Sequence, residues 1–279
     1  MIEQLEIHTA AGTFDALAAG TPGGREVLLL HGFPQGAVEW EFQLEALGGG
    51  GCHAVAPDQR GYSPGVRPER AAEYRLEELV GDVVAIADRL GWERFDLIGH
   101  DCGALVGWAV ADRIPGRIRT FSAVSHPHPT ALEQAMAKDE DQAQRAHHLT
   151  MLRQPRAAER ILLADDSAGL RRIFEWKVSE EHVEDYVRRL ERPGALTAAL
   201  NWYRATHLAS PIGPVSVPTL YVWSTEDATV GSTAALATQK YVSGPYRFEM
   251  LEDVSHWIPE EAPEALTRLL IRHLLAHRA

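Results

Sequence analysis

The segment FDLIGHDCGALVGWAVA, residues 95–111, predicts a strand that turns directly into a helix. Phe95–Ile98 is a short apolar run, typical of a buried parallel strand, and residues 104–112 have the composition of a buried helix. A G-x-D-x-G turn centred on Asp101 joins the two. Its glycines permit the tight turn and leave the central side chain unobstructed. The first N–H groups of the helix and its positive dipole end favour a carboxylate at this position.

This turn has the sequence context of a nucleophile elbow, in which the central side chain attacks the substrate. The simpler alternative is that Asp101 only caps the helix. A second turn, GYSPG at residues 61–65, has Ser63 at its centre. We reject it as an elbow because Pro64 has no N–H to donate to an oxyanion. Cys102 lies one position off the centre of the first turn, and we expect it to be a small packed thiol.

Further strands and helices alternate on both sides of this segment. We expect strands within residues 3–20 (two), 26–30, 53–56, 118–124, 219–223 and 246–251, and helices at 76–90 and 263–277. Such alternation predicts a mostly parallel sheet with helices on both faces. From about residue 127 to 212 the chain is instead charged, His-rich and helical, which indicates a helical insertion. Functional sites in such sheets lie at the carboxyl ends of the strands.

Polar residues follow the expected strands at these ends. The motif HGFP at residues 31–34 comes directly after the strand at 26–30. We expect the backbone N–H groups of Phe33 and Cys102 to converge there as oxyanion donors.

Two later strand ends supply an acid and a base. Ser224-Thr225-Glu226-Asp227 follows one strand, and His256 follows the next. We favour Asp227 as the acid that orients the histidine, with Glu226 as the alternative. The chain order Asp101, Asp227, His256 is the nucleophile–acid–base order of α/β-hydrolases.

The composition excludes several classes of protein. The chain has 279 residues, a net charge of −12 and 45% hydrophobic residues, as expected of an ordinary globular protein. Its two cysteines, Cys52 and Cys102, form neither a disulfide framework nor a zinc pattern, which favours a cytoplasmic location. The acidic balance argues against a nucleic-acid partner. Without a long apolar run or a signal-peptide pattern, we expect no membrane association.

Taken together, the motifs resemble those of the α/β-hydrolase superfamily and, within it, the epoxide hydrolase group. The resemblance covers essentially the whole chain and is carried by HGFPQ (31–35), PDQRGYSPG (57–65), GHDCGA (99–104), LNWYRA (200–205), VWSTED (222–227) and SHWIPEEAPE (255–264). It implies the α/β-hydrolase fold, with a core of residues 1–126 and 213–279 and a helical cap at 127–212. It also implies a cis peptide bond between Phe33 and Pro34.

The resemblance further implies that Asp101 is the nucleophile and that His256, held by Asp227, activates water. Two cap residues should hydrogen-bond the epoxide oxygen. Tyr203 matches the second of these, and His148 stands where the first, usually Tyr, is expected.

We expect a substrate pocket around these groups. Cys102 replaces the Trp that usually follows the nucleophile, which should enlarge or reshape the pocket floor. The other residues expected to line the pocket are His31, Pro34, Gln35, Trp40, His100, Leu149, Trp202 and Trp257.

The expected activity is hydrolysis of an epoxide to a vicinal diol through an alkyl ester on Asp101. It requires a small-molecule substrate and water, but no cofactor or metal. One alternative is a haloalkane-type dehalogenase with the same three residues, in which Trp40 or Trp202 supplies a halide-binding N–H. Haloacid chemistry is disfavoured because Cys102 and Leu149 replace the Arg and Trp of fluoroacetate dehalogenases. A non-catalytic binding protein on this fold is a third hypothesis, and the oligomeric state is open.

Overall fold

The computed structural model describes residues 1–174, 176–205 and 211–277. Its centre is an eight-stranded sheet in the order β1-β2-β4-β3-β5-β6-β7-β8. The strands are β1 (Ile2–Thr9), β2 (Gly12–Gly20), β3 (Arg25–Leu30), β4 (Cys52–Pro57), β5 (Phe95–His100), β6 (Ile118–Val124), β7 (Thr219–Glu226) and β8 (Tyr246–Ser255). Only β2 runs antiparallel to its neighbours, and every pair from β4 to β8 is parallel. The predicted mostly parallel sheet is therefore confirmed.

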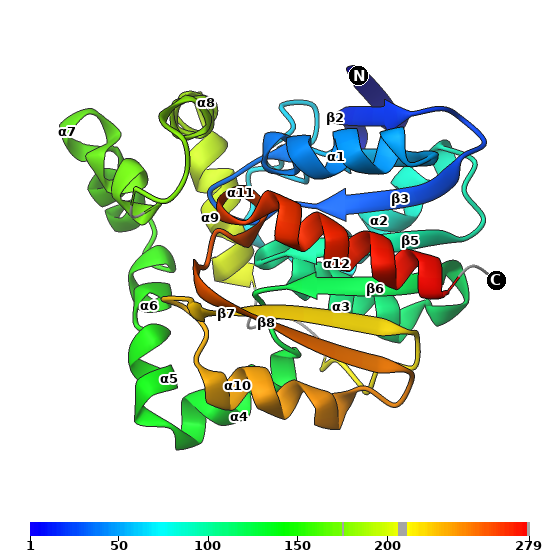
Figure 1. Ribbon diagram of the computed structural model, residues 1–279. Coiled ribbons are helices and arrows are strands. Elements are labelled where there is room, and N and C mark those ends of the chain that lie inside the picture. The colour runs from blue at the N-terminus through cyan, green and yellow to red at the C-terminus, as the bar shows by residue number, and fades with distance from the viewer. Residues whose placement is uncertain (175, 206–210, 278–279) are drawn as a thin grey trace.

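Helices cover both faces of the sheet, as Figure 1 shows. Alternate residues of β3 show why. Val27 and Leu29 are buried in one apolar cluster with residues of α1 (Glu41–Gly49) and α12 (Pro263–Ala276). Leu28 and Leu30 are buried in a second cluster with residues of α2 (Leu76–Arg89) and α3 (Cys102–Arg113). A continuous apolar strand of this kind fits the centre of a sheet that is buried on both sides.

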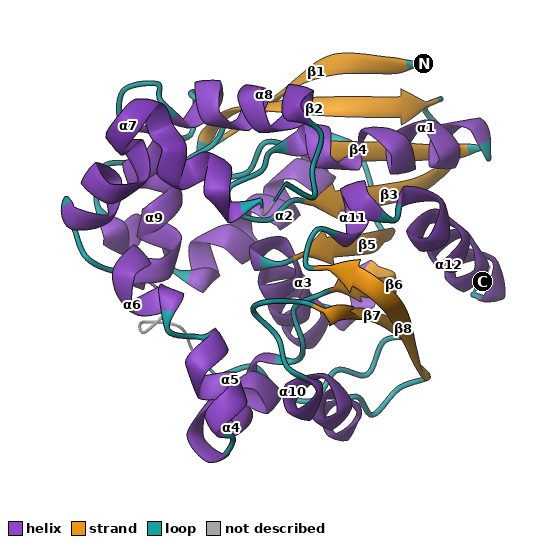
Figure 2. Cartoon of the chain, turned by 60° about the vertical axis from the view of Figure 1, so that its left-hand side comes forward, coloured by secondary structure: helices purple, strands orange, loops and turns teal. Residues whose placement is uncertain are grey.

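Between β6 and β7 the described part of the chain forms a helical insertion. Its helices are α4 (Pro129–Lys138), α5 (Glu140–Arg145), α6 (His148–Leu152), α7 (Ala157–Ile173, with non-helical backbone at residues 164–167), α8 (Glu180–Leu190) and α9 (Ala195–Ala205). They lie beside one end of the sheet, the end to which the β3 arrow points in Figure 1. The turned view in Figure 2 also separates the insertion from the strands.

Shorter elements complete the core. They are the 3₁₀ helices η1 (Ala37–Trp40), η2 (Ala71–Tyr74), η3 (Pro115–Arg117) and η5 (Thr238–Tyr241), and the helices α10 (Ser232–Ala237) and α11 (Ile258–Glu261). Among the residues that the structure describes, no helix combines the length and the apolarity needed to cross a membrane.

The insertion is fastened to the core through α8. Arg189 forms an ion pair with Asp58, with Nη1 and Oδ2 2.7 Å apart. Tyr186 donates a hydrogen bond of 2.9 Å to Glu260 of α11. His182 lies between two carboxylates, 3.4 Å from Glu260 and 3.5 Å from Glu41 of α1. Hydrogen bonds to these carboxylates outweigh burial and raise the pKa of His182.

The raised pKa makes this attachment pH-dependent. A histidine whose pKa is higher in the folded state stabilises the fold fully below its unfolded pKa, and loses this effect as pH rises through the folded value. Replacing His182→Gln should therefore lower the melting temperature in mildly acidic buffer. The deficit should shrink as pH rises from about 5.5 to 9. Calorimetry of both proteins across this range tests the prediction, and a deficit independent of pH would contradict it.

Candidate active site

The turn that carries Asp101 has an unusual backbone. Asp101 has φ 48° and ψ −120°, a conformation that costs free energy for a residue other than glycine. Neighbouring chain segments approach so closely that only glycine fits beside it. A Cβ atom on Gly103 would lie 2.2 Å from the carbonyl oxygen of Leu30, and one on Gly99 would lie 2.5 Å from that of Gly103. The turn therefore places Asp101 between the ends of β5 and β3.

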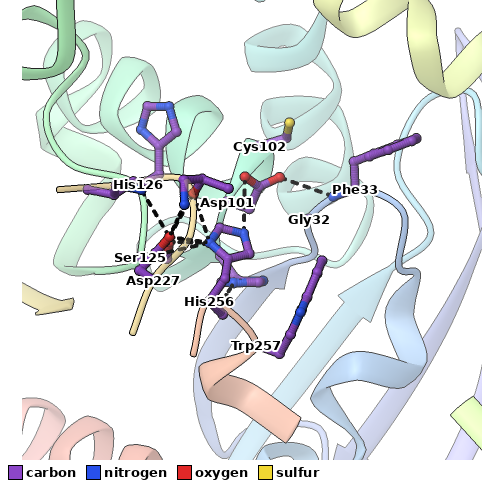
Figure 3. A network of polar contacts seen from close by, with 12 residues as sticks. Gly32, Phe33, Asp101, Cys102, Ser125, His126, Asp227, His256 and Trp257 are labelled. Atoms are coloured by element: carbon purple, nitrogen blue, oxygen red, sulfur yellow. Dashed lines mark hydrogen bonds and ion pairs between the residues drawn. The ribbon is translucent and has the colours of Figure 1, made fainter. Parts of the chain in front are cut away.

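The Asp101 carboxylate contacts Phe33 through one oxygen and His256 through the other. The backbone N–H of Phe33 donates to Oδ1 at 3.2 Å, and Nε2 of His256 lies 3.5 Å from Oδ2 (Figure 3). Gly32 permits the approach, because a Cβ there would lie 2.7 Å from Cβ of Asp101. The peptide bond between Phe33 and Pro34 is cis, as the resemblance implied.

The other nitrogen of His256 faces Asp227. Nδ1 lies 3.0 Å from Oδ2 and 3.1 Å from Oδ1 of this carboxylate. Asp227 is fully buried, whereas Glu226 is exposed. The geometry thus favours Asp227 over Glu226 as the acid. The fold also brings together Asp101, Asp227 and His256, which are distant in the sequence but were each predicted to lie at the end of a strand.

Further donors surround the Asp227 carboxylate. Oδ1 accepts hydrogen bonds from the Thr229 N–H and hydroxyl, both at 2.8 Å, and from the Val230 N–H at 3.0 Å. Oδ2 accepts one from the Ser125 hydroxyl at 2.5 Å, and Figure 3 shows Ser125 beside both Asp227 and His256. Ser125 and Thr229 were not predicted from the sequence. Their only signal was their place just after a strand, because Ser125 directly follows β6 and Thr229 lies three residues after the end of β7.

Helix α5 of the insertion holds the loop that follows Asp227. Arg145 donates to the Asp227 carbonyl oxygen at 2.5 Å. Gln142 donates to the Thr229 carbonyl oxygen at 2.9 Å and accepts from the Gly231 N–H at 2.8 Å. The insertion therefore supports the backbone of the predicted acid.

Opposite charges set the protonation of these groups. Burial alone would raise the pKa of Asp101 and of Asp227. The imidazole of His256 outweighs burial and holds the pKa of both carboxyl groups well below their usual range. Burial likewise would lower the pKa of His256, but Asp227 and Asp101 raise it to about 10. Two carboxylates thus share one imidazolium.

A cavity of about 550 Å³ opens beside Asp101. Of the predicted residues, Cys102, His148, Leu149, Trp202 and Tyr203 line it. Helices α2, α3 and α4 add an apolar wall that was not predicted, formed by Leu76, Leu79, Leu105, Leu132 and Met136. Their apolar character gave no signal that separates a pocket wall from a core.

Tyr203 lies close to the elbow. The Cys102 thiol donates to its hydroxyl oxygen across 3.5 Å, and the Tyr203 and Phe33 rings meet edge-to-face with their centres 5.4 Å apart. Burial raises the pKa of the Tyr203 phenol well above its usual value. The phenol is therefore protonated at neutral pH.

His148 differs from the expectation that it donates to the substrate. Its Nδ1 lies 2.7 Å from the carbonyl oxygen of Arg145. A carbonyl oxygen only accepts, so Nδ1 carries the proton and Nε2 of the neutral ring is an acceptor. Burial lowers the pKa of His148 and favours this neutral form.

Both indoles proposed as halide donors are placed otherwise. Trp40 is fully buried in the core cluster on the α1 and α12 face and does not line the cavity. Trp202 lines the cavity, but its Nε1–H donates to the Arg60 carbonyl oxygen at 2.9 Å. The prediction of a halide-binding indole at these positions is therefore wrong.

Five other residues expected in the pocket lie outside the cavity lining: His31, Pro34, Gln35, His100 and Trp257. Most of them support the site from behind. His31 accepts a hydrogen bond from the Gln59 N–H at 3.0 Å, and Gln35 donates to Glu260 at 2.6 Å. His100 lies 3.0 Å from the His256 carbonyl oxygen, and the Trp257 ring packs against His256.

Ser63, at the centre of the rejected turn, has a structural role. Its hydroxyl donates to the Asp58 carbonyl oxygen at 2.7 Å and accepts from the Asp15 N–H at 2.9 Å. The side chain is fully buried and does not line the cavity. Ser63 is thus no nucleophile. Among the described residues, no cluster of His, Cys, Asp and Glu is arranged to hold a metal ion.

The chain is similar to known proteins in sequence and in fold. The family model described as "alpha/beta hydrolase fold" matches residues 26–263. Epoxide hydrolase A of Mycobacterium tuberculosis is 30% identical, over 92% of this chain and 92% of its own. Epoxide hydrolase 3 of Xenopus tropicalis is 30% identical over 92% of this chain and 73% of its own. The crystal structure of Epoxide Hydrolase A from Mycobacterium thermoresistibile superposes with a TM-score of 0.85 at 26% identity, covering 98% of each chain.

The charge balance of the site predicts a measurable pKa. Because Asp227 raises the pKa of His256, Asp227→Asn should move the titration of the His256 ring below its native value of about 10. NMR of histidine-labelled protein follows this titration directly. Glu226→Gln is the matched control, because Glu226 is exposed and should leave the titration unchanged. A larger shift in Glu226→Gln than in Asp227→Asn would reverse the assignment of the acid.

Proposed function

Because the chain belongs to the α/β-hydrolase family and, within it, to the epoxide hydrolase group, we propose that it hydrolyses an epoxide to a vicinal diol. One observation carries the proposal. The elbow presents the carboxylate of Asp101, between the Phe33 amide and the His256 ring, to a largely apolar cavity. A carboxylate attacks a saturated carbon without first losing a proton, and it forms an ester that water can hydrolyse.

The first step is alkylation of Asp101. The lowered pKa of this carboxyl keeps it ionised, so that one oxygen attacks an epoxide carbon and the bond from that carbon to the ring oxygen breaks. The ring oxygen gains negative charge and needs a hydrogen-bond donor. The Tyr203 phenol, protonated and in the cavity wall, is the donor that we propose.

The second step is hydrolysis of the ester. Water attacks the ester carbonyl carbon, His256 takes its proton, and the N–H groups of Phe33 and Cys102 stabilise the oxyanion. The ester bond then breaks, which releases the diol and regenerates the Asp101 carboxylate. Asp227 stabilises the imidazolium that forms.

Alkylation also prepares His256 for this role. In the resting protein both carboxylates raise the pKa of the ring to about 10, so the ring is protonated. Esterification removes the charge of Asp101 and with it part of this effect, and the pKa of His256 falls toward the working pH. The ring then loses its proton, which neutralises the alkoxide formed from the epoxide oxygen, and the base becomes available only after the ester has formed. The proton that it later takes from water restores the resting imidazolium.

The helical insertion contributes to this site and gives a domain division. We propose that residues 127–212 act as a cap on a core of residues 1–126 and 213–279. The cap supplies Tyr203 and the wall residues His148 and Leu149. Both cysteines are free thiols, which fits the cytoplasmic location that we propose.

The covalent intermediate is the first test. His256→Gln should still form the ester but fail to hydrolyse it, so mass spectrometry after incubation with an excess of a styrene-type epoxide should find one substrate mass on Asp101. Asp101→Asn is the control and should remain unmodified. A folded His256→Gln protein that turns over normally would rule out the proposed base. In wild type with enzyme in excess and heavy-oxygen water, label in Asp101 is expected, since water attacks its carboxyl carbon.

The donor to the ring oxygen is the second test. Tyr203→Phe should lower epoxide turnover at least about tenfold. This is a conservative minimum, because a positioned acid typically contributes about 10²–10⁴-fold. Alkylation of Asp101 by a reactive alkyl halide should survive, because halide needs no proton. His148→Leu should change turnover much less at neutral pH, because its neutral ring presents no N–H beyond the one given to Arg145. Equal losses on epoxide and halide in Tyr203→Phe would indicate packing instead.

A further inference from the structure

Glu39 is a carboxyl group buried behind the loop that carries the Phe33 amide. It lies in η1 and its side chain is fully buried. Among the ion pairs that the described residues form, it is paired only with His100, whose ring is also fully buried. A buried carboxylate without a cationic partner is costly, so the state of this group needs an explanation.

Two backbone groups of the proposed machinery are linked through Glu39 and His100. The Gly32 N–H donates to Oε2 of Glu39 at 3.2 Å. The adjacent amide, that of Phe33, donates to Asp101. On the other side, Nδ1 of His100 lies 3.4 Å from both carboxyl oxygens of Glu39, and Nε2 lies 3.0 Å from the His256 carbonyl oxygen.

Hydrogen-bond accounting fixes the number of protons on this pair. The His256 carbonyl oxygen only accepts, so Nε2 of His100 carries a proton. The neutral ring then has a bare Nδ1, which faces Glu39. If Glu39 were ionised, the lone pair of Nδ1 would face a lone pair of the carboxylate, and neither group could donate a hydrogen bond. Contact between the two groups requires one more proton between them, so the pair is neutral overall. Such a proton also gives Oε1 of Glu39, otherwise without a hydrogen bond, a partner in His100.

The electrostatics agree with this count. Burial, followed by the charge of Glu260, raises the pKa of Glu39 well above its usual value, and Asp101 adds to this. The Gly32 N–H and the His256 ring act in the opposite direction but are outweighed. Burial lowers the pKa of His100 to about 4. The shared proton therefore lies on Glu39.

We propose that Glu39 is a positioning residue that works as a neutral carboxylic acid, bracing the Gly32–Phe33 loop and, through His100, the backbone of His256. The role rests on the proposed function, because it concerns the amide that is expected to stabilise the oxyanion. The neutral state matters for the same reason. A carboxylate beside this loop would oppose the negative charge that develops on the ester at Asp101.

Glu260 supplies the natural comparison. Its side chain is also buried and its charge acts on Glu39, but it is surrounded by donors: Gln35 at 2.6 Å, Tyr186 at 2.9 Å and His182 at 3.4 Å. A carboxylate suits Glu260, and a carboxylic acid suits Glu39. Replacement of each by the isosteric amide should therefore have opposite consequences.

Glu39→Gln keeps an acceptor for Gly32 and a donor for His100, and it cannot ionise. It should fold and keep kcat for the epoxide within about threefold of wild type, since it loses no positioned group. At alkaline pH it should keep more activity than wild type, because wild type loses the proton of Glu39 there. Glu39→Met fills a similar volume without either bond. It should lower kcat by up to about 100-fold, as expected of a misplaced oxyanion donor, with little change in KM.

A measurement without substrate separates this proposal from the proposed function. The infrared difference spectrum of wild type against Glu39→Gln, at neutral pH, should contain the C=O stretch of a protonated carboxyl group. Glu260→Gln is the matched control and should show the loss of a carboxylate band and a lower melting temperature. If wild type hydrolyses no epoxide, the spectrum still decides the state of Glu39.

A carboxylate band lost in Glu39→Gln would overturn the neutral state. A folded Glu39→Gln protein as impaired as Glu39→Met would overturn it too, because the working form would then be ionised. A fully active Glu39→Met protein would show that Glu39 positions nothing. If Glu39→Met does not fold, the spectrum and the pH profile of Glu39→Gln decide the question alone.

Discussion

The site depends on the crossing of three chain segments at Asp101. The end of β3, the turn after β5 and the start of α3 approach so closely that side chains at Gly32, Gly99 and Gly103 would overlap backbone or the Asp101 side chain. This contact fixes the positive φ of Asp101 and the distance from its carboxylate to the Phe33 amide. The parallel sheet and its two covering layers supply the rigidity that holds such a strained turn in place.

Several buried ionisable groups lie close together around this crossing. Asp101 and Asp227 flank one imidazole, which lowers the pKa of both carboxyl groups, while the two carboxylates raise the pKa of the imidazole. A third carboxyl, Glu39, is buried within the electrostatic reach of Asp101. Its neutral state, which we propose, adds no further negative charge beside the loop of Gly32 and Phe33.

Much of this arrangement was predictable because it follows from local patterns. The glycine-framed turn, the apolar strands and the order of polar residues at strand ends predict that Asp101, Asp227 and His256 lie together. Other features depend on contacts between distant segments. His148 donates a hydrogen bond to the Arg145 carbonyl oxygen, and this leaves the other ring nitrogen as an acceptor. No feature of the sequence indicates that bond. The burial of Trp40 depends likewise on how α1 and α12 pack on the sheet.

The clamp that α5 forms on the loop after Asp227 bears on how such enzymes diversify. Gln142 and Arg145 belong to the inserted segment, yet they bond the backbone at residues 227–231, which belongs to the sheet side of the molecule. The insertion is thus not a detachable cassette. A chimera that takes its inserted helices from a relative would gain new cavity-lining residues, but it would also lose the hydrogen bonds that hold the loop after Asp227. If the exchange began after α5 instead, the hydrogen bonds of Gln142 and Arg145 would be kept. Recombination between relatives should therefore succeed more often at a junction after α5 than at the end of β6.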